Sequence, residues 1–277
     1  NWLVHAIDFL FLILCSCKSD NQYQWLYSLA KPWEINQRQY DEILPKFYKN
    51  FPDFDKRLKA INLWRLGTPY GIFKSGEEKA PDADPILRID TTDCTIHVLT
   101  SIAMSTSTTW AATKKKMIDI HYKSNANGIK TPDYSLRWHY TSDRITNNPY
   151  TINITKNIVP LEILQEVELT LNKKHNGSEF LDLNWSLKNK FSFIPTAHIN
   201  QAVISRLPDI CGVAFIKKSY MKNGILIAHE GFVIDNKYLI HASSAHKKTV
   251  KEDLIEYLNP KKGSKFDGVM FYKISSG

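Results

Sequence analysis

Apolar side chains in the first quarter of the chain recur at helical spacing. Between about residues 21 and 66 they are rich in Trp, Tyr, Phe and Leu, and their period predicts helices rather than strands. Three prolines divide this region into several short helices: Pro32, Pro45 and Pro52. A Gly/Pro turn at residues 67–71 ends it, and the next apolar run, at residues 94–103, predicts a buried helix.

The C-terminal third has the spacing of strands. Four apolar runs are separated by short linkers, which predicts an antiparallel meander: 212–216, 225–234, 238–244 and 268–274. Alternation predicts further strands at residues 117–122, 134–140 and 167–171, and a short helix is expected at 201–207. Helices first and strands later predict an α+β fold.

The first residues form an apolar segment with three interpretations. Residues 3–14 are too short for a comfortable membrane span and resemble the hydrophobic part of a secretory signal. Cys17 follows at a spacing that loosely resembles a lipoprotein cleavage site, and a helix packed on the body is the third interpretation. We therefore expect residues 1–20 to be a signal-like or packing helix and residues 21–277 to form one α+β domain.

Composition narrows the classes of partner. The 277 residues carry a formal net charge of +8, which suits anionic surfaces and polymers. Lys and Arg are scattered, however, and no basic-aromatic pattern specific to nucleic acid occurs, so no nucleic-acid partner is expected. The four Cys residues lack zinc-site or CxxC spacing, so we expect neither a metal nor another cofactor: Cys15, Cys17, Cys94 and Cys211.

Cys94 is the candidate nucleophile. Thr91, Thr92 and Asp93 are all acceptable N-cap residues, so the Cys falls in the first turn of the expected helix. The positive end of the helix dipole there favours the thiolate. The alternative is a small buried hydrophobic residue without chemistry.

Two histidines on adjacent expected strands are candidates for the base. Side chains alternate with period two, so a two-residue turn would place His229 and His241 on opposite faces of the sheet. A three-residue loop at residues 234–236 would set them directly opposite each other on one face. His97, three residues after Cys94, is a local competitor for the same role.

Short motifs in this order resemble the NlpC-type cell-wall cysteine peptidases, which are papain-like. They are Gly-Thr-Pro-Tyr at 67–70, Asp-Cys at 93–94, Ala-His-Glu-Gly-Phe at 228–232 and His-Ala-Ser-Ser at 241–244. Arg-Trp-His-Tyr at 137–140 resembles a segment of a narrower branch of unknown function that is loosely called N-acetylmuramoyl-L-alanine amidase-like. The resemblance covers about residues 60–277, but Ile96 and Leu99 stand where that branch has Thr and an acidic residue.

The resemblance implies a papain-like core in which a Cys-bearing helix packs on an antiparallel sheet. It implies Cys94 as nucleophile, His229 as base and His241 as the residue that orients the base. The implied reaction is hydrolysis of an amide in peptidoglycan or its peptide fragments, by a bacterial protein exported to the periplasm or cell envelope.

Three further residues are expected to contact the substrate. Tyr70 would line the site, while Arg137 and His139 would contact an acidic peptide stem; a core aromatic and a polar strand face are the alternatives. Two other functions stay open: a non-catalytic cell-wall binding module and a Cys-dependent acyltransferase. An N-terminal anchor is the only membrane contact expected.

Overall fold

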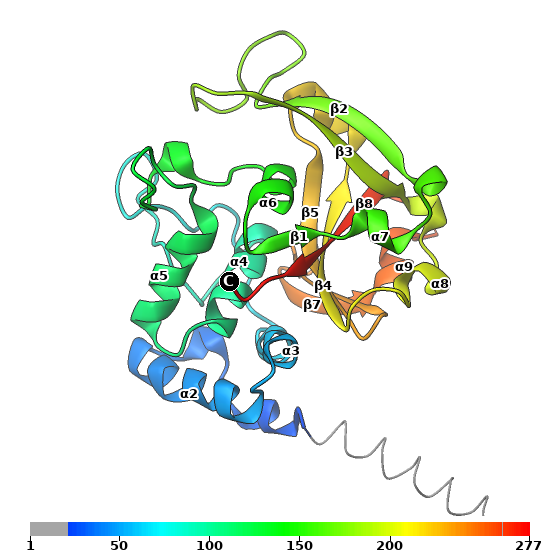
Figure 1. Cartoon of the computed structure of the whole chain (residues 1–277). Coiled ribbons are helices and arrows are strands. Elements are labelled where there is room, and N and C mark those ends of the chain that lie inside the picture. The colour runs from blue at the N-terminus through cyan, green and yellow to red at the C-terminus, as the bar shows by residue number, and fades with distance from the viewer. Residues whose placement is uncertain (1–21, 262) are drawn as a thin grey trace, which may run out of the picture.

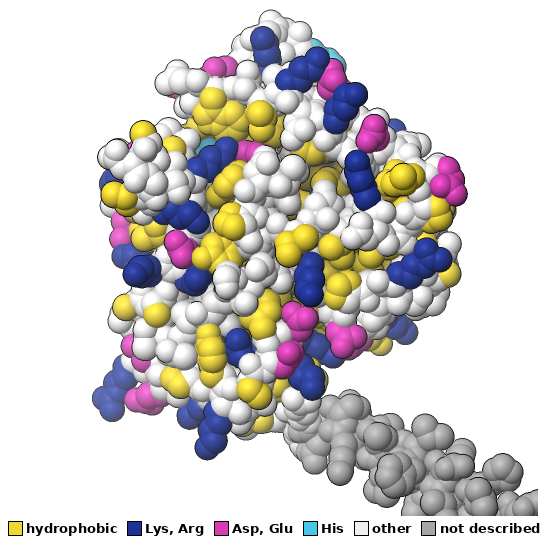
Figure 2. All heavy atoms as spheres, in the orientation of Figure 1, with side chains coloured by type: hydrophobic (Ala, Val, Ile, Leu, Met, Phe, Trp, Pro, Cys, Tyr) yellow, Lys and Arg dark blue, Asp and Glu magenta, His cyan; other side chains and the backbone are white. Residues whose placement is uncertain are grey.

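The computed structural model describes residues 22–261 and 263–277 of the chain (Figure 1). The signal-like or lipoprotein segment expected at residues 1–20 lies outside the described residues. Within the described part, none of the helices combines the length and apolar character needed to cross a bilayer. Figure 2 shows Lys and Arg side chains distributed among apolar and acidic ones over the face in view.

The N-terminal region is helical, as the apolar spacing predicts. Pro45 lies inside a helix instead of ending one, so the division expected at this proline is wrong. The Asn36 side chain caps that helix, and Tyr40, Leu44 and Phe47 are buried along it, which outweighs the missing proline N–H. The elements are η1 (Gln24–Ser28), η2 (Pro32–Glu34), α2 (Gln37–Asn50) and α3 (Phe54–Trp64).

The strands expected at residues 117–122 and 134–140 are absent from those segments. Residues 117–121 lie in helix α5 (Trp110–His121), which Thr109 caps and which buries Met117 and Ile120 at helical spacing. Six residues of alternation cannot distinguish this helix from a strand. Residues 134–140 contain the single turn η3 (Tyr134–Leu136) and an extended segment before α6 (Thr141–Asn147).

The strands form one antiparallel sheet in the order β2-β3-β8-β4-β5-β6-β7, with β1 paired to β8. The four C-terminal strands expected from the sequence are present, but β8 pairs with β4 instead of extending the meander after β6. The strands are β1 (Thr151–Asn153), β2 (Gln165–Leu171), β3 (Leu187–Pro195), β4 (Ile210–Ile216), β5 (Ile227–Ile234), β6 (Tyr238–Ser243), β7 (Lys248–Asp253) and β8 (Gly268–Ile274).

Both faces of the sheet are covered. In β4, Ala214 and Ile216 pack toward the core that includes α4 (Cys94–Ser105) and α5, whereas Val213 and Phe215 pack toward α8 (Gln201–Ile204) and α9 (Leu254–Leu258). Figure 1 shows α2, α4 and α5 to one side of the sheet and α8 and α9 to the other. The remaining short helices, α7 (Thr155–Ile158), η4 (Leu161–Ile163), η5 (Thr196–His198) and η6 (Lys218–Asn223), lie in connections.

A buried carboxylate joins the helices to the sheet. Glu230 of β5 is 1% exposed and forms an ion pair with Arg144 of α6. Its carboxylate also accepts hydrogen bonds from Thr95 Oγ1 at 2.9 Å, Thr141 Oγ1 at 2.9 Å and the Tyr272 hydroxyl at 2.8 Å. One side chain thus ties α4, α6 and β8 to β5.

Removing this carboxylate is expected to destabilise the fold strongly. Glu230→Ala leaves the Arg144 charge buried without a partner, so we expect the free energy of unfolding to fall by about 3–5 kcal/mol in urea denaturation. Glu42→Ala, which breaks an exposed pair with Arg38 within α2, is the control and should leave the urea midpoint unchanged. Equal stability of the Glu230 variant and the parent would contradict the assignment.

Candidate active site

Cys94 is the first residue of α4, as the sequence predicts, and Asp93 is the N-cap. The Asp93 carboxylate accepts the Ile96 N–H at 2.9 Å and, with its other oxygen, the Phe73 N–H at 3.1 Å. One side chain therefore caps the helix and fixes the preceding loop against it. Cys94 as a whole residue is partly exposed at this junction.

The electrostatics of the thiol differ from the sequence expectation. Burial, followed by the negative charges of Asp93 and Glu230, raises the pKa of Cys94 to about 12, although the Glu230 backbone amide and the Thr95 hydroxyl act in the opposite direction. This shift is opposite in direction to the one expected from the helix dipole, which favours the thiolate. The resting group is a neutral thiol beside the main chain of β5 at Glu230.

The loop between β5 and β6 decides the placement of the histidines. It has three residues, Asp235–Lys237, because Ile234 pairs with Tyr238, and Asp235 and Asn236 have φ values of 55° and 49°. The odd length places His229 and His241 on one face, as a shared task requires. The loop lies one residue later than the 234–236 loop of the sequence prediction, so the residue on β6 that faces a given residue of β5 is shifted by two. The two histidines are therefore diagonal neighbours on the same face instead of directly opposite each other.

The two imidazoles are hydrogen-bonded to each other, and a carboxylate extends the chain. His229 Nε2 lies 2.7 Å from His241 Nδ1. His241 Nε2 lies 2.7 Å from Glu252 Oε2, on the next strand, β7. Gly231 provides the space, because a Cβ there would lie 2.9 Å from the His241 Cβ and 2.6 Å from the Ile240 carbonyl oxygen.

Aromatic rings enclose the pair. Phe215 stacks on His229 with ring centroids 5.6 Å apart, and Tyr257 of α9 meets the His241 ring edge-on at 4.8 Å. Desolvation lowers the pKa of His229 to about 3 and that of His241 to about 4. Both imidazoles are therefore neutral at neutral pH.

A cavity of about 460 Å³ opens beside this pair. Its walls come from β5, β6, the loop after β6, β7, α9, the connection between β4 and β5 and the segment before β8. They include His229, His241, Glu252, Tyr257, Lys217 and Phe266. Cys94 is not one of the lining residues. Among residues 22–261 and 263–277, no group of three His, Cys, Asp or Glu is arranged to hold a metal ion.

The family model described as AmiA-like, N-acetylmuramoyl-L-alanine amidase-like, matches residues 61–264. The chain belongs to this AmiA-like family. That membership indicates a peptidoglycan-related hydrolase. No curated protein matches the chain.

Solved structures with the same fold accompany the family match. A Legionella pneumophila protein has a TM-score of 0.70 at 20% identity, covering 88% of this chain and 97% of its own. An N-acetylmuramoyl-L-alanine amidase from Bacteroides uniformis has a TM-score of 0.59 at 22% identity, covering 80% of this chain and 99% of its own. At these identities the likeness shows the AmiA-like fold alone.

Tyr70 lies near Cys94, the candidate nucleophile of this AmiA-like chain. Its backbone bridges to Thr92, two residues before Cys94, and its N–H donates to the Lys247 carbonyl at 3.0 Å. Burial and then the charges of Cys94 and Asp93 raise the pKa of the Tyr70 hydroxyl. A role in lining the site stays a prediction that this position supports.

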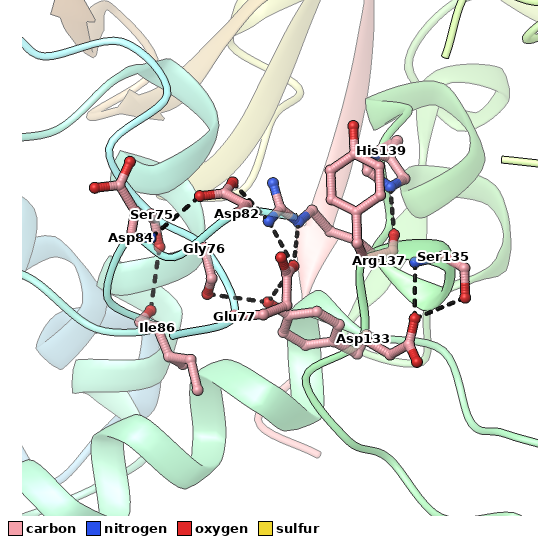
Figure 3. Close-up of polar contacts among 12 residues, drawn as sticks. Ser75, Gly76, Glu77, Asp82, Asp84, Ile86, Asp133, Ser135, Arg137 and His139 are labelled. Atoms are coloured by element: carbon pink, nitrogen blue, oxygen red, sulfur yellow. Dashed lines mark hydrogen bonds and ion pairs between the residues drawn. The ribbon is translucent and has the colours of Figure 1, made fainter. Parts of the chain in front are cut away.

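Arg137 and His139 form a separate cluster (Figure 3). The Arg137 guanidinium donates from Nε to Glu77 Oε1 at 2.8 Å and from Nη2 to Asp82 Oδ2 at 2.9 Å, and His139 Nε2 lies 2.6 Å from the Tyr134 carbonyl oxygen. These polar groups are engaged with the loop at residues 75–86 and with their own segment. Contact with a peptide stem stays a prediction, and it would require these bonds to rearrange.

His97 lies in the interior of the AmiA-like fold. It is fully buried, its Nε2 lies 2.9 Å from Asn62 Oδ1, and its ring packs against Phe232. Burial lowers the pKa of His97 well below 6.5. These contacts favour the core role of His97 over its role as a competing base.

Glu252 is the site residue that the sequence analysis missed. It lies on β7, whose residues alternate only weakly between buried and exposed. Glu252 follows His241 by eleven residues. Its contact with His241 can be predicted only when β7 is recognised as a strand and its pairing with β6 is known.

The buried histidines predict a loss of stability in acid. The unfolded chain takes up protons on His97 and His121 below about pH 6.5, whereas burial keeps the pKa of each well below that value in the folded chain. The free energy of unfolding therefore falls as the pH drops below about 6.5. We expect His97→Gln to reduce this slope by up to about 1.4 kcal/mol per pH unit in urea unfolding.

The matched control is His198→Gln, because the His198 side chain is exposed in the folded chain. Its slope should equal that of the parent. A His97 variant with the parent slope would show that His97 titrates alike in both states, contrary to its burial.

Proposed function

We propose that this protein is a peptidoglycan hydrolase that cleaves an amide bond with a Cys-His-His thiol mechanism. The bond is either the one between N-acetylmuramic acid and L-alanine or one within the stem peptide. The observation that carries the proposal is the hydrogen bond between His229 on β5 and His241 on β6. Cys94 lies against the main chain of Glu230, the residue that follows His229 on β5. Family membership supports the substrate class.

Since the resting thiol and imidazole are both neutral, proton transfer accompanies attack. His229 takes the proton of Cys94 Sγ as the sulfur adds to the amide carbonyl. Collapse breaks the C–N bond, and His229 returns the proton to the leaving amine, which gives a thioester. Water then attacks the thioester and passes a proton to His229. Collapse breaks the C–S bond and releases the acid, and His229 returns its proton to Sγ, which restores the thiol.

The start of α4 offers stabilisation for the negative oxygen formed in these steps. First-turn N–H groups of a helix have no intrahelical acceptor, and the Asp93 cap occupies that of Ile96. The Cys94 N–H is therefore the donor that we assign to an oxyanion hole. We further propose that the protein acts in the cell envelope, where its proposed substrate occurs, with residues 3–14 as the export signal.

The proposal is tested with Cys94→Ala and His229→Ala. Each should reduce release of fragments from purified peptidoglycan by about 10³-fold or more, because nucleophile and base act as a unit. Mass analysis of the products of the parent identifies the amide that is cut. Transfer of the acyl group to an added amine instead of water would identify an acyltransferase.

Two variants serve as controls: Cys211→Ala for the loss of a thiol and His198→Ala for the loss of an imidazole. Both should release fragments like the parent, and circular dichroism should show that all four variants are folded. Full activity in either the Cys94 or the His229 variant rules out this mechanism, and glycan binding without cleavage by the parent would indicate a binding module.

A further inference from the structure

We propose that Glu252 is a positioning residue that sets the tautomers of both imidazoles and leaves Nδ1 of His229 as the base. The inference rests on the proposed function for the use made of His229. The tautomer assignment itself depends only on the hydrogen bonds. No part of the sequence motifs carries it, because Glu252 lies outside all of them.

The assignment follows from the direction in which hydrogen bonds are donated. A carboxylate only accepts, so at 2.7 Å from Glu252 Oε2 the His241 Nε2 must carry a proton. In a neutral imidazole the other nitrogen is then an acceptor. His241 Nδ1 therefore accepts, at 2.7 Å, the N–H of His229 Nε2, which leaves the lone pair of His229 on Nδ1.

The sheet fixes this order in space. β5, β6 and β7 are consecutive neighbours, and each supplies one member of the chain. His241 pairs with Val250, so Glu252, two residues on, lies on the same face one diagonal step away. His229 is related to His241 by a similar diagonal step. The buried His241, at 2% exposure, is thus held between two partners.

Other titratable groups around the pair do not provide this control. His246 bonds to Ser243, and Glu230 directs its carboxylate to the helices. Tyr257 contacts the rings by its face and edge. Among the residues that the structure describes, the charged side chain that hydrogen-bonds to one of the two imidazoles is that of Glu252, which bonds to His241.

The negative charge has a second effect during the reaction. When His229 accepts the thiol proton, a positive imidazolium forms among Phe215, Tyr257 and Phe266, which desolvate it. Glu252, whose side chain is 32% exposed, remains in contact with the solvent of the cavity and offsets that charge through His241. The same carboxylate thus orients the base before the reaction and stabilises its charged form during it.

The kinetic test uses Glu252→Gln in the full chain. The amide can donate to His241 Nε2, which permits the reversed tautomers and removes the charge. We expect kcat for peptidoglycan cleavage to fall by about 10²-fold or more while KM changes less than about threefold, because wrong tautomers in catalytic triads cost up to about 10⁴. Glu162→Gln, at an exposed glutamate of η4 outside the cavity, is the matched control and should keep the parent kcat.

The structural test reads the tautomers directly by ¹⁵N NMR of histidine-labelled protein. In the parent, His229 and His241 should both be protonated on Nε2, and in Glu252→Gln the two nitrogens of each ring should exchange character. Glu252→Asp keeps a carboxylate and should retain the parent tautomers, with partial recovery of kcat.

The two tests separate the two proposals. Parent protein that shows the Nε2 tautomers but cleaves nothing would refute the proposed function and keep the role of Glu252 in setting the rings. Protonation of His229 on Nδ1 in the parent overturns the inference, whether or not Glu252→Gln folds. Parent-like kcat in a folded Glu252→Gln overturns it as well.

Discussion

The period of two along a strand is the constraint on which the site depends. His229 and His241 meet only because the loop between β5 and β6 has an odd number of residues. That loop requires positive φ at Asp235 and Asn236, which are among the residues that tolerate the left-handed region best. The missing side chain of Gly231 then lets the two strands approach where the rings cross. The loop length, the two left-handed residues and the glycine therefore determine whether His229 and His241 can form a hydrogen bond, although none of the three takes part in the proposed reaction.

Local pattern sufficed for part of this arrangement. The cap at Asp93, the helix that begins at Cys94 and the strands β4, β5, β6 and β8 all follow from residues close in sequence. Helix α5 did not, because its apolar positions fit two periods at once over a few residues. Strand β7 did not, since it is polar and its existence depends on pairing with β6. The Glu252 contact was therefore out of reach of sequence reasoning, although both of its histidine neighbours were named.

The thiol shows how magnitudes decide between opposing effects. A helix N-terminus typically stabilises a nearby anion by about 0.3–1 kcal/mol. Raising the pKa of Cys94 from 9.0 to about 12 corresponds to ~4 kcal/mol in the opposite direction. Burial and two neighbouring carboxylates thus outweigh the dipole that the sequence analysis considered alone. The consequence for mechanism is that proton transfer becomes part of the attack instead of preceding it.

Two adjacent residues of β5 make different contributions: Glu230 joins the helices to the sheet, and His229 belongs to the candidate site. Glu230 points to the helical side, where its ion pair with Arg144 joins α6 to the sheet. His229 meets His241 and the cavity, and Tyr257 of α9, which contacts both rings, also lies close enough to Cys94 for the charge of Cys94 to act on its hydroxyl. Since consecutive side chains of a strand lie on opposite faces, the ion pair that anchors Glu230 also fixes the direction of the His229 ring. The ion pair on one face of the sheet and the imidazole pair on the other therefore share one short segment of β5.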